Sequence, residues 1–180
     1  MEEDLIAVVT RKGKFLKYIK NQTREICIAA VMSDSRALKY MKEQTEEICL
    51  IAIKSDPFAL EYVKDQTEEM CLIAVINKSK ALKYVKEQTE EICLVALKQS
   101  GLAFGYVKDQ TEEICLVAIE RHPSKILYIK HLTEEMCEIF ANHPILENME
   151  QGLRLASITK DKDPVMKEII NRRLSERFGK

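Results

Sequence analysis

Residues 89–96 read Thr-Glu-Glu-Ile-Cys-Leu-Val-Ala, and this octapeptide sets the architecture of the chain. Close copies of it recur along most of the 180 residues, and successive copies start 22 residues apart. The six copies begin at Thr23, Thr45, Thr67, Thr89, Thr111 and Thr133. A constant period of this length is typical of proteins built from stacked structural repeats. We therefore expect each unit to pack mainly on its neighbours in the sequence.

The first half of each unit has the signals of an α-helix of roughly ten residues. With the threonine taken as position 1, its hydroxyl suits a helix N-cap, and the acidic residues that follow suit the positive end of the helix dipole. Positions 4 to 9 are almost wholly apolar, as at residues 92–97, so this helix is predicted to be buried on most sides. Alanine at position 8 in five copies would let helices approach closely.

The second half of the unit predicts a short loop and a shorter helix. Breaking residues such as Asp56-Pro57 occupy positions 11 to 14, and positions 15 to 20 read Ala-Leu-x-Tyr-Val-Lys. Ala81, Leu82 and Val85 share one face of such a helix. The tyrosine at position 18 is predicted to bury its ring and keep its hydroxyl solvated or bonded. These tyrosines are Tyr18, Tyr40, Tyr62, Tyr84, Tyr106 and Tyr128.

A period of 22 residues also suits leucine-rich repeats, but the abundance of Ala, Leu, Glu and Lys favours helices over strands. The predicted fold is all-α: an α-solenoid of about seven two-helix 22-residue repeats over residues 1–144, with a C-terminal helical cap over residues 145–180. Within that cap we expect one helix inside residues 144–158. A final helix over residues 165–174 would be opened by Asp163-Pro164.

Composition and charge exclude several classes of protein. The net charge is −1, so the chain has no bulk attraction to nucleic acid or anionic membranes. The apolar runs are too short to cross a membrane. The acidic start of the chain does not resemble a signal peptide, so a cytoplasmic rather than secreted protein is predicted.

The six cysteines, one per repeat at position 5, are expected to be reduced thiols packed in the core. No catalytic residue, metal ligand, cofactor or small-molecule substrate is predicted. His122, His131 and His143 have no partner pattern for catalysis or zinc, and no glycine-rich phosphate loop is present. The sequence therefore does not predict an enzyme.

Residues 81–96 and 103–118 closely resemble a short helical repeat of unknown function. That repeat occurs in many copies in giant viruses of amoebae of the mimivirus kind and also in some bacteria. The similarity covers about residues 1–141. It implies a solenoid and a viral origin, and it brings no catalytic residues with it.

The predicted function is a protein–protein interaction scaffold acting on a host or viral protein, because stacked repeats present extended surfaces. The variable positions 11 to 14 are the expected binding rim. One alternative is RNA binding through the lysines at position 20 and the basic C-terminus, although acidic residues at position 21 favour a row of surface salt bridges there. Another is a self-associating structural component of a virion or virus factory. The candidate interaction residues are Lys20, Lys42, Lys64, Lys86, Lys108, Lys130, Asp34, Asp56, Lys78, Ser100, His122, Arg172, Arg173 and Arg177.

Overall fold

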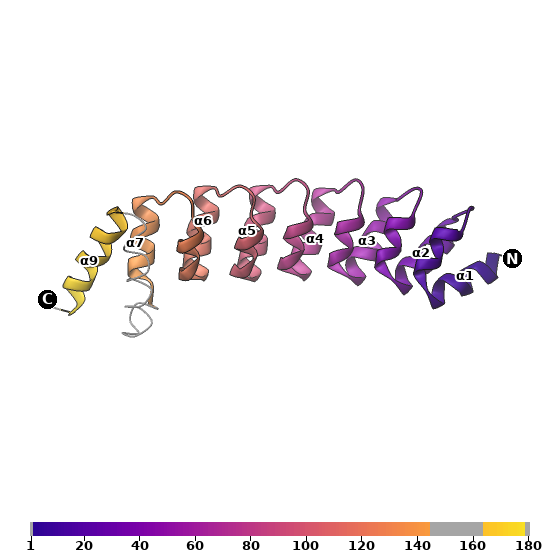
Figure 1. The fold of residues 1–180 in the computed structure, drawn as a ribbon, viewed down its shortest axis with the longest axis horizontal. Helices are drawn as coiled ribbons and strands as arrows, with labels where there is room; N and C mark the ends of the chain where they lie inside the picture. Colours follow the sequence, from indigo (N-terminus) through magenta and orange to yellow (C-terminus); the bar gives the residue numbers. More distant parts are fainter. Residues whose placement is uncertain (1, 145–163, 179–180) are drawn as a thin grey trace. The chain divides into compact units, whose positions relative to one another are not determined.

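A computed structural model describes residues 2–144 and 164–178 of the chain, with only part of the side chains in the second range. Within these ranges every regular element is a helix, and α-helices alternate with 3-10 helices from the N-terminus to residue 142 (Figure 1). The chain divides into two compact units, residues 1–99 and 100–180. Each unit is described by itself below.

The first unit contains five α-helices and four 3-10 helices, and each element packs on its neighbours in the sequence. Their bounds are α1 Glu2–Arg11, η1 Gly13–Tyr18, α2 Arg24–Ser33, η2 Ser35–Tyr40, α3 Glu46–Ser55, η3 Pro57–Tyr62, α4 Glu68–Asn77, η4 Ser79–Tyr84 and α5 Glu90–Gln99. The α-helices pack on one another in order, and so do the 3-10 helices.

The second unit continues the same alternation and then departs from it. Its described elements are η5 Gly101–Tyr106, α6 Glu112–Arg121, η6 Pro123–Tyr128, α7 Glu134–Asn142 and α9 Pro164–Phe178. Helix α9 packs against α7, the last α-helix of the repeat series. Ile169 of α9 is buried, being only 3% exposed. Helix α9 thus covers part of the last repeat helix.

Each α-helix from α2 to α7 starts at position 2 because the threonine at position 1 caps it. The Thr67 hydroxyl accepts a hydrogen bond from the backbone N–H of Met70 over 3.3 Å, and the equivalent bond forms in five other repeats. The glutamates that follow lie in the first turn, at the positive end of the helix dipole. The N-terminal signal predicted from the sequence is therefore confirmed.

The predicted loop at positions 11 to 14 is wrong in its extent, because a single residue at position 12 joins the two helices. Lys78 shows the arrangement: its N–H closes α4 on Ala74 O over 2.9 Å, and its carbonyl accepts the first bond of η4, from Ala81 N. Position 13 already belongs to the 3-10 helix and is buried at Gly13 and Pro57. At Gly13 a Cβ atom would lie 2.4 Å from Ala30 O, so only the smallest residue fits there.

The tyrosines at position 18 are less buried than predicted, because the second helix is a 3-10 helix. With three residues per turn, residues three apart share a face, so positions 13, 16 and 19 point inward together. Leu16 and Ile19 are buried, whereas Tyr18 and Tyr128 are 70% and 66% exposed. The other four tyrosines are half-buried. Two of the six tyrosine rings predicted to be buried, those of Tyr18 and Tyr128, therefore lie on the surface.

The core otherwise follows the prediction. Positions 4, 5, 8 and 9 of the α-helices are buried in every described repeat from α2 to α7, and they meet the inward residues of the 3-10 helices. All six cysteines are buried, as thiols rather than disulfides. The described residues thus form the helical repeats of an all-α solenoid. The helix expected within residues 144–158 lies outside the described residues, and α9 extends beyond its predicted bounds of 165–174.

Candidate interaction surfaces

Three of the lysines at position 20, Lys42, Lys64 and Lys86, donate hydrogen bonds to backbone carbonyls of the preceding repeat. The Lys42 ammonium donates to Lys20 O over 2.6 Å, and the Lys64 ammonium donates to Lys42 O over 3.0 Å. The Lys86 ammonium continues the series by donating to Lys64 O and to Val63 O. These carbonyls follow the C-terminal end of each 3-10 helix, where a cation is favoured. Each ammonium thus joins one repeat to the one before it.

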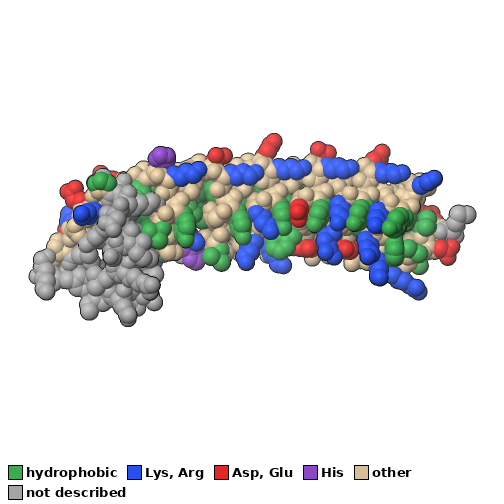
Figure 2. Space-filling model, viewed as in Figure 1, with side chains coloured by type: hydrophobic (Ala, Val, Ile, Leu, Met, Phe, Trp, Pro, Cys, Tyr) green, Lys and Arg blue, Asp and Glu red, His purple; other side chains and the backbone are tan. Residues whose placement is uncertain are grey.

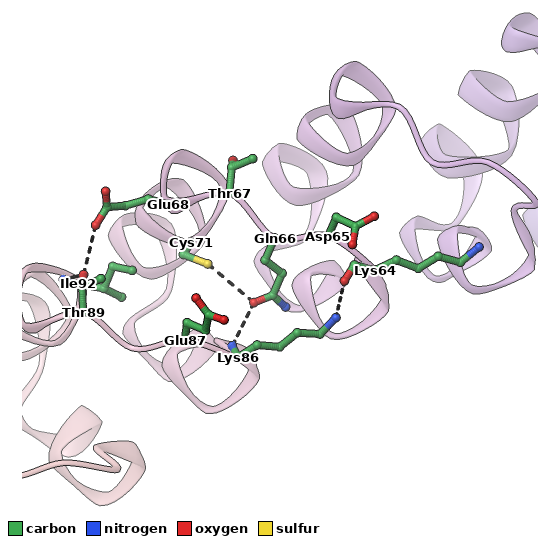
Figure 3. A pocket seen from close by; sticks show the side chains of 10 residues that line it. All are labelled: Lys64, Asp65, Gln66, Thr67, Glu68, Cys71, Lys86, Glu87, Thr89 and Ile92. Atoms are coloured by element: carbon green, nitrogen blue, oxygen red, sulfur yellow. Dashed lines mark hydrogen bonds between the residues drawn. The ribbon is translucent and has the colours of Figure 1, made fainter.

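Glutamine at position 22 makes the second set of bonds between repeats, a role that the sequence analysis missed. The Gln66 side-chain amide donates to Leu60 O and Tyr84 O over 2.9 and 3.0 Å, and its oxygen accepts from Lys86 N over 2.9 Å. Figure 3 shows Gln66 between Cys71 and Lys86, with its oxygen also within 3.7 Å of the Cys71 sulfur. The same amide bonds occur at Gln22 and Gln44.

One signal in the sequence indicates this role. Glutamine occupies position 22 wherever a tyrosine and a lysine follow 18 and 20 residues later, at Gln22, Gln44, Gln66, Gln88 and Gln110. The next copy has Leu132, and the residues 18 and 20 positions later are Glu150 and Gly152. The glutamine thus disappears from the sequence together with its partners.

A polar pocket of about 400 Å³ opens between the repeats beside this glutamine (Figure 3). Its lining combines the carboxylates of Asp65, Glu68 and Glu87 with the Lys86 ammonium, while the Lys64 side chain points away. The Glu68 carboxylate accepts a hydrogen bond from the Thr89 hydroxyl over 3.1 Å. An equivalent pocket of about 410 Å³ lies in the second unit, where His131 takes the place of Glu87.

Chemistry at the pocket is limited by the state of its cysteine. Burial raises the pKa of the Cys71 thiol to about 11. The thiolate is the reactive form of cysteine, so this thiol is neutral and unreactive near pH 7. The pocket therefore offers hydrogen bonds and charges but no activated nucleophile at Cys71.

The residues at position 12, predicted as a binding rim, divide into two groups. The side chains of Asp34, Asp56 and Ser100 cap the following 3-10 helix by accepting a backbone N–H two residues later. Asp34 also pairs with Arg36 over 2.9 Å, and this contact lowers the pKa of its carboxyl. Lys78 and His122 are exposed and make no side-chain cap bond. Of the five predicted rim residues at position 12, these two are therefore exposed without a capping bond.

Tyrosines and basic side chains meet on the outer side of the 3-10 helices. The Lys17 ammonium lies 4.6 Å from the centre of the Tyr18 ring. Its side-chain interaction with the Tyr18 hydroxyl raises the pKa of Lys17 and lowers that of Tyr18. The Lys39 ammonium lies 4.8 Å from the Tyr40 ring and 5.8 Å from the Tyr62 ring, so it bridges two repeats.

Counting residues 1–22 as the first repeat, the contacts between lysines and aromatic rings continue into the fourth, residues 67–88. The Lys78 ammonium lies 4.9 Å from the Phe58 ring, and the Lys83 ammonium lies 4.3 Å from the Tyr84 ring. Phe58 and Tyr84 meet edge to face at 5.9 Å. We call this surface the basic-aromatic face. It comprises positions 12, 14, 17 and 18 of the first four repeats: Lys12, Lys14, Lys17, Tyr18, Asp34, Arg36, Lys39, Tyr40, Asp56, Phe58, Glu61, Tyr62, Lys78, Lys80, Lys83 and Tyr84.

The charge of the basic-aromatic face differs from that of the whole chain. It carries eight lysines and arginines against three acidic residues, although the chain has a net charge of −1. Figure 2 shows blue and green side chains interleaved in a lower band, and an upper row in which red accompanies blue. In the second unit, positions 14 and 17 are uncharged, at Leu102, Gly105, Ser124 and Leu127. The excess of positive charge is thus confined to the first unit.

The predicted basic C-terminus is partly paired. Arg172 of α9 forms an ion pair with Glu138 of α7, which lies within the same unit. The side chains of Arg173 and Arg177 lie outside the described part of the structure. Arg172 therefore helps to hold α9 on the last repeat helix.

Metal-binding and membrane-spanning features are absent from the described residues. These residues contain no group of three or more His, Cys, Asp or Glu side chains placed to hold a metal ion. None of the helices in the described ranges is both long and apolar enough to cross a membrane.

The alternating helices and the bonds between neighbouring repeats define a helical repeat protein of the solenoid class. Residues 23–67 match the model of a family described as a domain of unknown function (DUF4116). The matched segment contains the repeats that begin at Thr23 and Thr45. In the same comparisons no curated protein and no solved structure matched the chain. The family model thus supports the repeat and leaves the function open.

Proposed function

We propose that the chain is a non-enzymatic protein–protein interaction scaffold. One observation carries the proposal: the inward positions keep their residue type from repeat to repeat, while the outward positions of the 3-10 helices change. Position 14 is lysine, arginine, phenylalanine, lysine, leucine and serine in successive repeats. Such a surface differs along its length in charge and shape, as recognition of one particular protein requires.

Exposed apolar groups on the same side of the repeats support a protein partner. Leu102 is 58% exposed and Tyr128 is 66% exposed. Aromatic residues are enriched at protein interfaces. Lys42, Lys64 and Lys86 give less support to RNA binding, because their ammonium groups donate to backbone carbonyls. The similarity to repeats of giant viruses leads us to propose further that the partner is a host or viral protein in the cytoplasm or virus factory.

Affinity capture from amoebal lysate tests the proposal. The tagged full-length chain is compared with a variant that carries Lys80→Glu and Leu102→Asp, two exposed position-14 changes. A matched control carries Glu69→Lys and Glu113→Lys at exposed sites near the starts of α4 and α6. We expect one stoichiometric protein that survives nuclease, is lost with the first variant and is kept with the control. Recovery that requires intact RNA, or a partner held equally by all three proteins, would contradict the proposal.

A further inference from the structure

The basic-aromatic face has the chemistry of a site for carboxylate groups. Each exposed lysine at position 17 lies beside the ring of the tyrosine that follows it, as at Lys17, Lys39 and Lys83. The ammonium and the phenolic hydroxyl of such a pair are both hydrogen-bond donors, and a carboxylate can accept from either. One such pair occurs in three of the first four repeats, with Glu61 in the remaining one.

The lysines occupy the ring faces on which a nucleic-acid base would stack. The Lys83 ammonium lies 4.3 Å from the Tyr84 ring centre, and that ring also meets Phe58 edge to face. Proteins that bind single strands rely on open aromatic faces for stacking. The arrangement thus favours a partner that offers anionic groups rather than bases.

The repeat sets the spacing that a bound chain must match. Neighbouring packed helices lie about 8–10 Å apart. An extended peptide advances about 3.3 Å per residue, so every third residue meets an equivalent point on the next repeat. Carboxylates at every third position would be in register with the Lys–Tyr pairs of the first, second and fourth repeats. In the third repeat Glu61 occupies position 17, and the Lys39 ammonium lies 5.8 Å from the Tyr62 ring.

We propose that the basic-aromatic face binds an extended acidic peptide segment with a carboxylate at about every third residue. The inference rests on the proposed scaffold function and names the chemistry of the partner. Charge complementarity carries it, because eight basic residues on this face oppose three acidic ones.

Fluorescence anisotropy with the full chain tests the spacing directly. One labelled peptide carries glutamate at every third position, and a second has the same composition with its glutamates contiguous. We expect the first to bind at least about tenfold more tightly, with an affinity that falls as salt rises. Equal binding of the two peptides would overturn the proposal. Tighter binding of a single-stranded RNA of equal charge would also overturn it.

Matched variants locate the site. Lys17→Gln, Lys39→Gln and Lys83→Gln together remove three charges from exposed side chains of the face, and we expect at least about a tenfold loss of peptide affinity. Lys20→Gln, Lys108→Gln and Lys130→Gln remove three exposed charges at position 20, and we expect a change below about twofold. Thermal melting checks that both variants fold. A reversed order of losses would assign the peptide to the position-20 lysines and overturn the proposal.

Failure of this inference is distinguishable from failure of the scaffold function. If neither peptide binds while a nuclease-resistant protein is still captured, the acidic-peptide proposal is wrong and the scaffold proposal stands. If neither peptide binds, no protein is captured and light scattering shows mass that rises with concentration, the chain associates with itself and both proposals are wrong.

Discussion

At the scale of single residues, the glutamine at position 22 shows how one side chain joins two repeats. The Gln66 amide satisfies two backbone carbonyls and one backbone N–H, and the two groups from the following repeat belong to Tyr84 and Lys86. A backbone group that loses its partner in a half-buried site costs free energy, because water replaces the bond only in part. We therefore expect the Gln66 side chain to contribute more to the stability of the fold than an exposed polar side chain does.

Replacing this side chain should destabilise the first unit. Gln66→Ala leaves three backbone groups without their present partner, and we expect the free energy of unfolding to fall by about 2–4 kcal/mol. Gln99→Ala, at an exposed site at the end of α5, should change it by less than about 0.5 kcal/mol. Denaturant titration followed by circular dichroism measures both. Equal effects of the two changes would show that the hydrogen bonds of Gln66 contribute little to stability.

The cysteines give a second prediction at this scale. Burial raises the pKa of Cys71 from 9.0 to about 11, so the folded chain holds about a hundredfold less thiolate at this site than the unfolded chain near pH 8. We expect labelling of Cys71 by a disulfide reagent, read by mass spectrometry, to be at least that much slower in the native protein than in denaturant. Rapid native labelling of Cys71 would contradict the burial shown here.

The same shift predicts a dependence of stability on pH. The folded state holds the Cys71 proton more tightly than the unfolded state does. This thiol therefore stabilises the fold fully below about pH 9, and its contribution is lost as pH rises through about 11. Cys71→Ala should make the fall in stability above pH 9 less steep, measured by denaturant titration at several pH values. An unchanged slope would argue against the raised pKa.

At the scale of elements, the C-terminal helix α9 covers the last α-helix of the repeat series. Ile169 is buried and Arg172 pairs with Glu138 of α7. The last unit of a repeat protein needs such a cover because its outer face has no following repeat. The packing of α9 on α7 is what a cap on the repeat series predicts, and the alternative is a basic helix that docks on a partner.

Truncating the buried side chain tests this role. We expect Ile169→Ala to lower the free energy of unfolding of the second unit by about 2 kcal/mol, because it leaves a cavity against α7. Asn171→Ala, at an exposed position of the same helix, should have little effect. Hydrogen exchange of α7 amides measures the change locally. Unaltered protection of α7 in the Ile169 variant would favour a docking helix instead.

At the scale of the whole molecule, each repeat in the first unit packs on its neighbours, so stability is expected to be distributed along the chain. In proteins of this kind, stability is close to a sum of repeat terms and nearest-neighbour terms. A defect in one repeat should therefore loosen that repeat and the adjacent ones first.

Leu82→Ala provides the test, because Leu82 is fully buried in η4. We expect a loss of about 2–5 kcal/mol in local stability. Hydrogen exchange should accelerate in α4 and α5, which pack on η4, while amides of α7 keep their protection. Leu102→Ala, at an exposed site, serves as the control. Uniform acceleration over both units would show that the chain unfolds as one cooperative body.

The α-helices and the burial of Ile, Cys and Ala in them could be predicted from sequence, because capping and apolar periodicity act within a few residues. Thr67 and Cys71 behave as their local pattern indicates. The 3-10 form of the second helix, the exposure of Tyr18 and the partners of Lys42 and Gln66 could not be predicted in this way. The atoms that Lys42 and Gln66 bind in neighbouring repeats lie 18 to 22 residues away in the chain, and only the stacking of those repeats brings them within reach.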